Sequence, residues 1–173
     1  MELSYFDVTV PVFIKSLNNL KAILKKGEAH AKEIGMSESD FLDQKLAEDM
    51  FPLLRQIQVV TDTAKGAVAR LAGVDQMQIE DAETTCAELY KRIDTVTEHI
   101  ETFRKEAFSG AGDRHIVLPY YEGKHFLGRD YLVEFAFPNF FFHLNMAYAL
   151  MRKQGTTIGK QDYLGSLSLQ EGE

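Results

Sequence analysis

The sequence predicts an all-α protein, a four-helix bundle with a short β-hairpin between its third and fourth helices. Four segments repeat apolar residues every three or four positions, which places them on one face of an α-helix. The segment from Cys86 to Phe103 keeps this spacing without a break, as the seam of a helix bundle requires. Between the third and fourth segments the period changes to two, which is typical of β-strands.

Composition favours an ordinary soluble protein with one domain, spanning residues 1–173. Of its residues 45% are hydrophobic and 26% are charged, and this length suffices for a sizeable core. The net charge of −7 disfavours binding to nucleic acid, which needs clustered Lys and Arg. The single cysteine, Cys86, excludes an intrachain disulfide and a Cys-based zinc cluster, and we expect it to be a small buried side chain.

We expect a cytoplasmic protein that does not enter the membrane. The first residues, MELSYFDVTVPVF, lack the basic region and the apolar run of a signal peptide. No stretch approaches the roughly 20 consecutive apolar residues of a membrane span.

The first helix is predicted from one apolar face, with His30 exposed near its polar end. Ser37 and Asp40 then resemble a capping box that opens a short helix. The second long helix begins near Asp49 or Pro52 and ends at Gly73, a residue suited to a C-cap. The apolar faces of the two long helices comprise Val10, Phe13, Leu17, Leu20 and Leu24, and Leu53, Ile57, Val60, Ala64, Ala67 and Leu71.

The third helix follows a capping box formed by Thr85 and Glu88. His99 lies beside its apolar seam, and we expect this histidine to be solvated or at the boundary of the core. Its seam residues are Cys86, Leu89, Ile93, Val96, Ile100 and Phe103.

The run HIVLPYY-EG-KHFL, which follows Arg114, predicts a β-hairpin. Ile116, Leu118 and Tyr120 alternate, and Gly123 supplies the positive φ of a tight turn. Two strands alone are marginally stable, so the hairpin must lie against the helices. Its two histidines, His115 and His125, are expected to be exposed.

The fourth helix, from about Gly128 to Gly155, is apolar on two sides. One side would meet the bundle, and the other predicts a homodimer interface, unless the hairpin and the C-terminal tail cover it. Pro138 should kink or locally open this helix, because it lacks an N–H and clashes with the carbonyl of Glu134. The tail 166–173 should be frayed. The predicted interface comprises Phe137, Phe140, Leu144 and Tyr148.

His143 is the candidate functional residue of this helix, with Asn139 one turn before it. Two imidazoles at positions i and i+4 would project from one helix face and could bind a metal together. Here the second position holds its histidine and the first holds an amide.

The whole chain resembles the DinB-like superfamily of four-helix bundles, in a branch described only as a domain of unknown function. The resemblance lies in VPVFIKSLNNLKAIL, in DMFPLLRQIQVVTDTAKGAVARLAG, and in GRDYLVEFAFPNFFFH with GKQDYLG. It implies an up-down-down-up order of the helices. Many members end in a pattern like H-x-x-x-H-R-G-Q, and Arg152 and Gly155 align this chain with it.

That alignment puts the later family histidine on His143 and the earlier one on Asn139. A third family histidine lies early in the second helix, where Gln58 is a slightly better match than Gln56. The resemblance implies a divalent ion held by three histidines with one open position. With two imidazoles replaced by amides, the site becomes a poor one for Zn²⁺ or Ni²⁺, so we expect no cofactor. If a metal does bind, His143, Asn139 and Gln58 would hold it.

Gln58, Asp62 and Lys65 share a face of the second helix and could form a polar pocket with Asn139 and His143. Three interpretations remain open. The side chains could form a structural network that replaces the metal, or bind a small molecule with His143 as general base or hydrogen-bond donor. Alternatively, Asp62 and Lys65 face solvent.

Two functions follow from these expectations. The first is a non-catalytic or small-ligand-binding DinB-like protein with a degenerate metal site. The alternative is a divalent-metal-dependent transferase, isomerase or hydrolase that acts on a thiol-bearing small molecule, as the resemblance implies for other branches.

Overall fold

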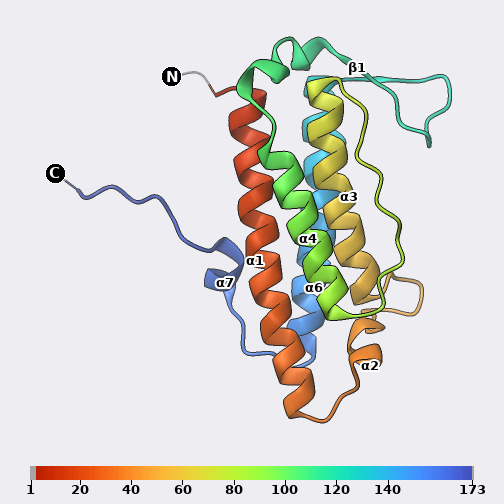
Figure 1. The fold of residues 1–173 in the computed structure, drawn as a ribbon, viewed down its shortest axis with the longest axis vertical. Helices are drawn as coiled ribbons and strands as arrows, with labels where there is room; N and C mark the ends of the chain where they lie inside the picture. Colours follow the sequence, from red (N-terminus) through yellow and green to blue (C-terminus); the bar gives the residue numbers. More distant parts are fainter. Residues whose placement is uncertain (1–2, 173) are drawn as a thin grey trace.

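A computed structural model of the chain, which describes residues 3–172, has four long helices packed side by side (Figure 1). Their bounds are Tyr5–Glu33 for α1, Leu53–Ala72 for α3, Cys86–Glu101 for α4 and Phe137–Lys153 for α6. In Figure 1, α1 and α6 run downward while α3 and α4 run upward. The four-helix bundle and its up-down-down-up order are therefore confirmed.

The helix ends follow the local sequence signals. Thr85 and Glu88 form the expected capping box of α4, and Ser37 caps the short helix α2, Glu38–Leu42. Gly73 ends α3 at a φ of 73°, in the left-handed region that glycine occupies without strain. Helix α1 begins earlier than its apolar repeat, at a capping box of Ser4 and Asp7.

The core lies where the predicted apolar faces meet. All the residues of those faces in the first three long helices are buried, with the exception of Phe103, which follows the end of α4 and is half-buried. Phe13 of α1 packs its ring against that of Phe140 in α6, with centroids 4.7 Å apart. His30 differs from expectation, because it is half-buried and its Nε2 lies 3.0 Å from the carbonyl oxygen of Gln154.

Helices α3 and α4 are parallel, so residues 73–85 return along the whole bundle (Figure 1). Helix α3, with 20 residues, is about 30 Å long at 1.5 Å per residue. An extended chain gains up to about 3.3 Å per residue, so these residues can span that length when most of them are extended, whereas they would be too short as a helix. Residues 73–85 therefore do not form a compact turn, and they line one side of the pockets described below.

The β-hairpin is present but its ladder is much shorter than the alternation suggested. Strands β1, His115–Ile116, and β2, Phe126–Leu127, pair antiparallel, and turns fill residues 117–125. Pro119 has no N–H to donate, which explains why the ladder does not extend toward Tyr120. Ile116 and Leu118 are still buried, so the hairpin does lie against the helices. Two 3₁₀ turns, η1 (Lys105–Phe108) and η2 (Ala111–Asp113), precede it.

The fourth helix is continuous from Gly128 to Lys153, with a local opening before Pro138. It starts as α5, Gly128–Asp130, passes through the π-helical segment η3, Tyr131–Ala136, and continues as α6. Pro138 cannot donate to the carbonyl of Glu134, and wider bonds in the preceding turn relieve the clash. The predicted disturbance is thus present, one turn earlier than the proline.

The side chains predicted for a dimer interface are placed differently from expectation. Phe140 and Leu144 are buried within the chain's own core, while Phe137 and Tyr148 are half-buried. Phe137 packs against Phe13 of α1, and Tyr148 packs against Tyr163 of the short helix α7, Lys160–Leu164. The prediction that these four residues form the interface is therefore wrong for Phe140 and Leu144, and dimerisation itself stays a prediction.

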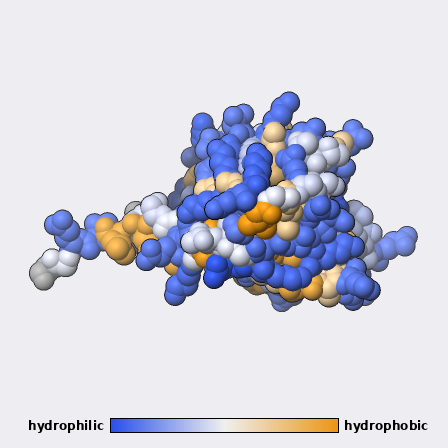
Figure 2. Space-filling model, turned by 90° about the horizontal axis from the view of Figure 1, so that it is seen from below, coloured by the Kyte–Doolittle hydropathy of each residue, from blue (hydrophilic) through white to orange (hydrophobic). Residues whose placement is uncertain are grey.

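The end of the bundle that faces the viewer in Figure 2 is mainly polar, with scattered apolar patches. Residues 166–172 form neither helix nor strand and extend away from the bundle (Figures 1 and 2). None of the helices within residues 3–172 combines the length and the apolar character needed to cross a membrane.

Candidate functional site

His143 of α6 is bonded to Gln56 of α3. The His143 Nδ1 lies 2.6 Å from the Gln56 Oε1, and both side chains are buried. The Gln56 amide is oriented by a second bond, from its Nε2 to the carbonyl oxygen of Phe51. The oxygen of the amide therefore faces the imidazole, so His143 donates from Nδ1–H and leaves Nε2 unprotonated.

His143 is a neutral imidazole at pH 7. Burial, and secondarily the positive charge of Arg55, hold the pKa of His143 below its ordinary value of 6.5. The ring stacks 6.2 Å from that of Phe51 and lines a small pocket of about 210 Å³. His143 therefore resembles a hydrogen-bonded histidine of the core more than a metal ligand.

Asn139 has a partner of its own on α3. Its Nδ2 donates to the Thr63 hydroxyl over 2.8 Å, and that hydroxyl donates to the carbonyl oxygen of Val59. Because α3 and α6 are antiparallel, the pairs Asn139–Thr63 and His143–Gln56 occupy successive levels along the two helices. The two positions that match family histidines are thus each bonded to a different side chain.

Of the two glutamines considered for the third ligand position, Gln56 bonds to His143, and the slightly favoured Gln58 does not. Gln56 and Gln58 are separated by about 200° around an α-helix, so only one of them can face α6. Gln58 faces away from α6, where it accepts from Arg55 and donates to Glu83. The family pattern positions the third histidine on the second helix only to within about one turn, which does not distinguish Gln56 from Gln58.

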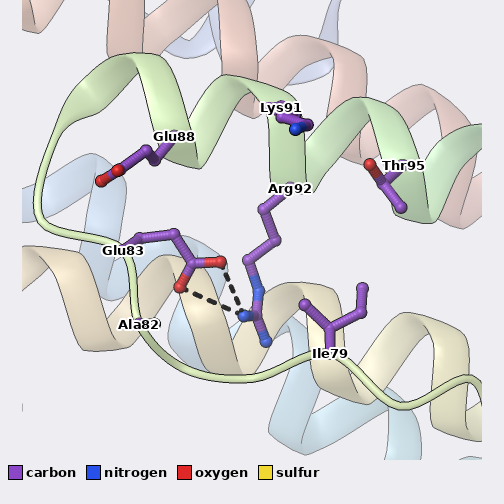
Figure 3. A pocket seen from close by; sticks show the side chains of 7 residues that line it. All are labelled: Ile79, Ala82, Glu83, Glu88, Lys91, Arg92 and Thr95. Atoms are coloured by element: carbon purple, nitrogen blue, oxygen red, sulfur yellow. Dashed lines mark hydrogen bonds and ion pairs between the residues drawn. The ribbon is translucent and has the colours of Figure 1, made fainter.

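Gln58 and Asp62 belong instead to a network around Arg92 of α4. The Arg92 side chain is 1% exposed and pairs with Asp62 at 2.7 Å, with Asp81 at 2.9 Å and with Glu83 at 3.0 Å. In Figure 3, Arg92 and Glu83 point toward each other and are joined by hydrogen bonds in the lining of a pocket of about 280 Å³. Ile79, which like Glu83 belongs to the 73–85 connection, lies beside them. This network ties the 73–85 connection to both α3 and α4.

Asp62 and Lys65 also contribute to a larger cavity near Asn139. Lys65 is buried and pairs with Asp62 over 3.1 Å. The cavity has a volume of about 310 Å³ and lies between α3, residues 76–79, the hairpin and η3. Of the five residues predicted for a pocket, the structure brings Asn139, Asp62 and Lys65 to this cavity, and it separates Gln58 and His143 from them.

Several residues that line this cavity do not belong to the predicted site. Arg70 of α3 and Tyr131 of η3 line it, together with Arg55 and Gln76. Arg70 lies two turns beyond Thr63, the partner of Asn139, on the same face of α3. Helical spacing therefore predicts its place beside the cavity. Tyr131 and Gln76 are positioned by the π-helical segment and by an irregular connection, for which periodicity gives no signal.

The side chains at the family's ligand positions fit a divalent metal poorly. The set offers one imidazole, and the remaining groups are amides and a hydroxyl already paired with one another. Zn²⁺ and Ni²⁺ favour several imidazole or thiolate donors. No carboxylate is bonded to His143, Gln56 or Asn139 within residues 3–172 to compensate.

A different group, Glu28, Glu38 and Cys86, brings ligand atoms within 4.8 Å of one another. These atoms have other partners: Glu28 binds Lys32 and the Tyr90 hydroxyl, and Glu38 accepts from the Cys86 backbone N–H. Burial, followed by the charges of Glu28 and Glu38, raises the pKa of the Cys86 thiol to about 12. The thiol is thus protonated and buried, as expected for Cys86.

The remaining histidines lie away from the cavity. His115 and His125 are exposed, as predicted, and their rings stack 4.1 Å apart on the hairpin. His99 is half-buried at the core boundary, also as predicted, with its Nε2 buried and without a partner in the described part of the chain.

The bundle and its paired helix positions define a DinB-type four-helix protein. The chain belongs to the family described as "Domain of unknown function (DUF1993)", whose model matches residues 5–164. It is also similar to the crystal structure of a DinB family member protein from Shewanella denitrificans. That likeness has 40% identity and a TM-score of 0.93, and covers 96% of this chain and 95% of the other. No curated protein matches the sequence.

Proposed function

We propose that this DinB-family protein binds a small molecule without a metal, in the cavity between α3, residues 76–79, the hairpin and η3. The main support for this proposal is that the residues at the superfamily's ligand positions on α6 are hydrogen-bonded to α3. Asn139 bonds to Thr63, and His143 bonds to Gln56. These bonds give the polar groups at the ligand positions hydrogen-bond partners within the protein, and a polar cavity lies beside Asn139 and Thr63.

The cavity has the size of a small-molecule site, and its lining is mainly polar. Its volume of about 310 Å³ is at the lower end of the range typical of ligand pockets. Polar and charged side chains, among them Asn139, Gln76 and Arg70, form most of its lining, and Leu118 and Phe135 contribute to its apolar part. A π-helical segment forms one wall, and such segments are frequent at functional sites.

The competing expectation is a divalent-metal enzyme acting on a thiol-bearing small molecule. The Nε2 of His143 would be its one imidazole donor, and two amides would have to act as the other ligands, which is unfavourable for Zn²⁺ or Ni²⁺. Direct metal analysis distinguishes the two functions.

The experiment uses protein purified without chelator and without a nickel column. We expect zinc and nickel far below one equivalent, and a melting temperature that does not change when either ion is added, because no preformed ligand set is available to bind it. His125→Ala, on the exposed hairpin, controls for adventitious binding to histidine. Stoichiometric zinc or nickel that disappears in His143→Ala, but not in His125→Ala, would contradict the proposal.

A further inference from the structure

We propose that the cavity binds a small molecule carrying a carboxylate, with Arg70 and Tyr131 holding the carboxylate group. The inference rests on the proposed function, since it names the class of ligand for the same cavity. It is carried by a cationic side chain that lacks a counter-charge and by a buried hydroxyl that lacks an acceptor.

Arg70 is the cation of this cavity whose charge remains uncompensated. Three cationic residues line the cavity, and two have acidic partners: Arg55 pairs with Asp81, and Lys65 pairs with Asp62. Arg70 has no carboxylate within 4 Å in the part of the chain from residue 3 to residue 172. A half-buried guanidinium is stabilised by an anion, and its planar fork matches a carboxylate.

The guanidinium of Arg70 is held in position by its surroundings. It lies over the Tyr131 ring, 5.8 Å from the centroid, and its NH1 donates to the Tyr131 hydroxyl over 3.2 Å. On its other side is Gly66, where an added Cβ would come within 2.5 Å of the same NH1. The absence of a side chain at Gly66 is therefore what admits Arg70 to this position.

The Tyr131 hydroxyl is the second group available to a ligand. Tyr131 is 1% exposed, and burial raises its pKa although Arg70 acts in the opposite direction, so the hydroxyl keeps its proton. The oxygen accepts from Arg70, but no described residue accepts the hydroxyl proton. Buried tyrosine hydroxyls normally find a partner, and a carboxylate oxygen bound to Arg70 would be one.

The rest of the cavity determines what the carboxylate is attached to. Val59, Leu118 and Phe135 offer apolar surface, and the volume of about 310 Å³ limits the ligand to a small body. A compact acid with one apolar or aromatic face fits this combination of an anion site, a mainly polar lining and a smaller apolar wall.

The test compares matched acids and amides. Benzoate and phenylacetate, with benzamide and phenylacetamide as neutral counterparts, are titrated into the ¹⁵N-labelled full chain and followed by NMR. We expect the acids to shift the Arg70 Nε–H and Asn139 side-chain signals and to bind more tightly than the amides. Arg70→Gln should weaken acid binding by about ten- to a hundredfold, as loss of a charge-assisted hydrogen bond implies, without changing amide binding.

Two variants keep the result interpretable. Arg104→Gln removes the same charge at an exposed site whose side chain bonds only to backbone oxygens, and it should not affect binding. Arg70→Lys keeps the charge but loses the fork, and it should give an intermediate loss, which also covers the case that Arg70→Gln does not fold.

The outcomes separate the inference from the proposed function. Equal binding of acids and amides, or acid binding unaffected by both Arg70 variants, would overturn the carboxylate assignment while the cavity remains a ligand site. If neither the acids nor the amides shift signals from cavity residues, both the carboxylate assignment and the proposed function are overturned.

Discussion

At the residue scale, His143 makes folding stability depend on pH. Its pKa in the folded protein lies below the ordinary value of 6.5, because burial and Arg55 disfavour the imidazolium. The folded state therefore binds fewer protons than the unfolded state in mild acid, and the free energy of unfolding falls as pH drops below 6.5. We expect His143→Gln to lose this part of the pH dependence. Urea unfolding of both proteins between about pH 8 and about pH 5 measures it, and parallel stability curves would contradict the prediction.

Gln56 gives a second prediction at this scale. Gln56→Leu keeps the approximate size of the side chain but leaves the buried Nδ1–H of His143 without an acceptor. We expect a loss of about 1–3 kcal/mol in the free energy of unfolding, the usual penalty for a buried unsatisfied donor. Gln161→Leu, on the exposed surface of α7, is the matched control and should change stability by less than about 0.5 kcal/mol. Similar effects of the two substitutions in urea unfolding would show that the His143–Gln56 bond is not formed.

These residues show how far the sequence predicts the site. The importance of His143 and Asn139, and their location on one helix, follow from i, i+4 spacing together with the family resemblance. Their partners do not, because the choice between Gln56 and Gln58 depends on which side of α3 faces α6. One wrong step of two residues turns a side chain by about 200°, so local pattern alone cannot select it.

At the element scale, the connection between α3 and α4 depends on Arg92. This side chain compensates Asp62, Asp81 and Glu83 in a buried position. Burial raises the pKa of Asp81, but Arg55 and Arg92 more than offset it, so the pKa of Asp81 is lowered and its carboxylate stays charged. We expect Arg92→Met to lower the free energy of unfolding by about 3–5 kcal/mol, because it removes the buried cation shared by three carboxylates and leaves Glu83 without any cation among residues 3–172.

The same substitution should have a local signature. Backbone amides of residues 74–84 should exchange with deuterium faster in Arg92→Met, since the connection loses its ties to α3 and α4. Lys91→Met changes the adjacent, exposed side chain of α4, which takes part in no ion pair within the described residues, and it should have neither effect. Unchanged stability and unchanged exchange in Arg92→Met would show that the ion pairs do not hold the connection.

The elements differ in how well the sequence predicts them. Capping residues such as Thr85 and Gly73 act locally, and the helices end where these residues indicate. The extended course of residues 73–85 and the π-helical segment before Pro138 depend on packing across the bundle, which no local pattern records. The hairpin ladder was overestimated because Pro119 interrupts it, although that proline is visible in the sequence.

At the scale of the whole molecule, the fold follows from the sum of many weak signals. Amphipathic periodicity in four segments suffices to predict a bundle, and the family resemblance adds the order of the helices. What the bundle leaves exposed is harder to predict. The helical spacing groups Phe140 and Leu144 with the face predicted to form a dimer interface. Both are nevertheless buried in the core, where Phe13 of α1 packs against Phe140.

The outer edge of the fourth helix still carries apolar side chains, which supports the prediction of a homodimer. Val133 is 61% exposed, and the partly exposed rings of Phe137 and Phe141 continue its stripe. Exposed apolar stripes of this kind commonly mark contacts with another chain. We expect a dimer at micromolar concentration by light scattering, and we expect Val133→Glu to shift it to monomer, because a charge would be buried at the interface. Ala87→Glu adds the same charge at an exposed position of α4, a different helix from the one that carries the stripe, and should leave the dimer intact. A monomeric wild-type protein would refute the dimer, and a Val133→Glu dimer would place the interface elsewhere.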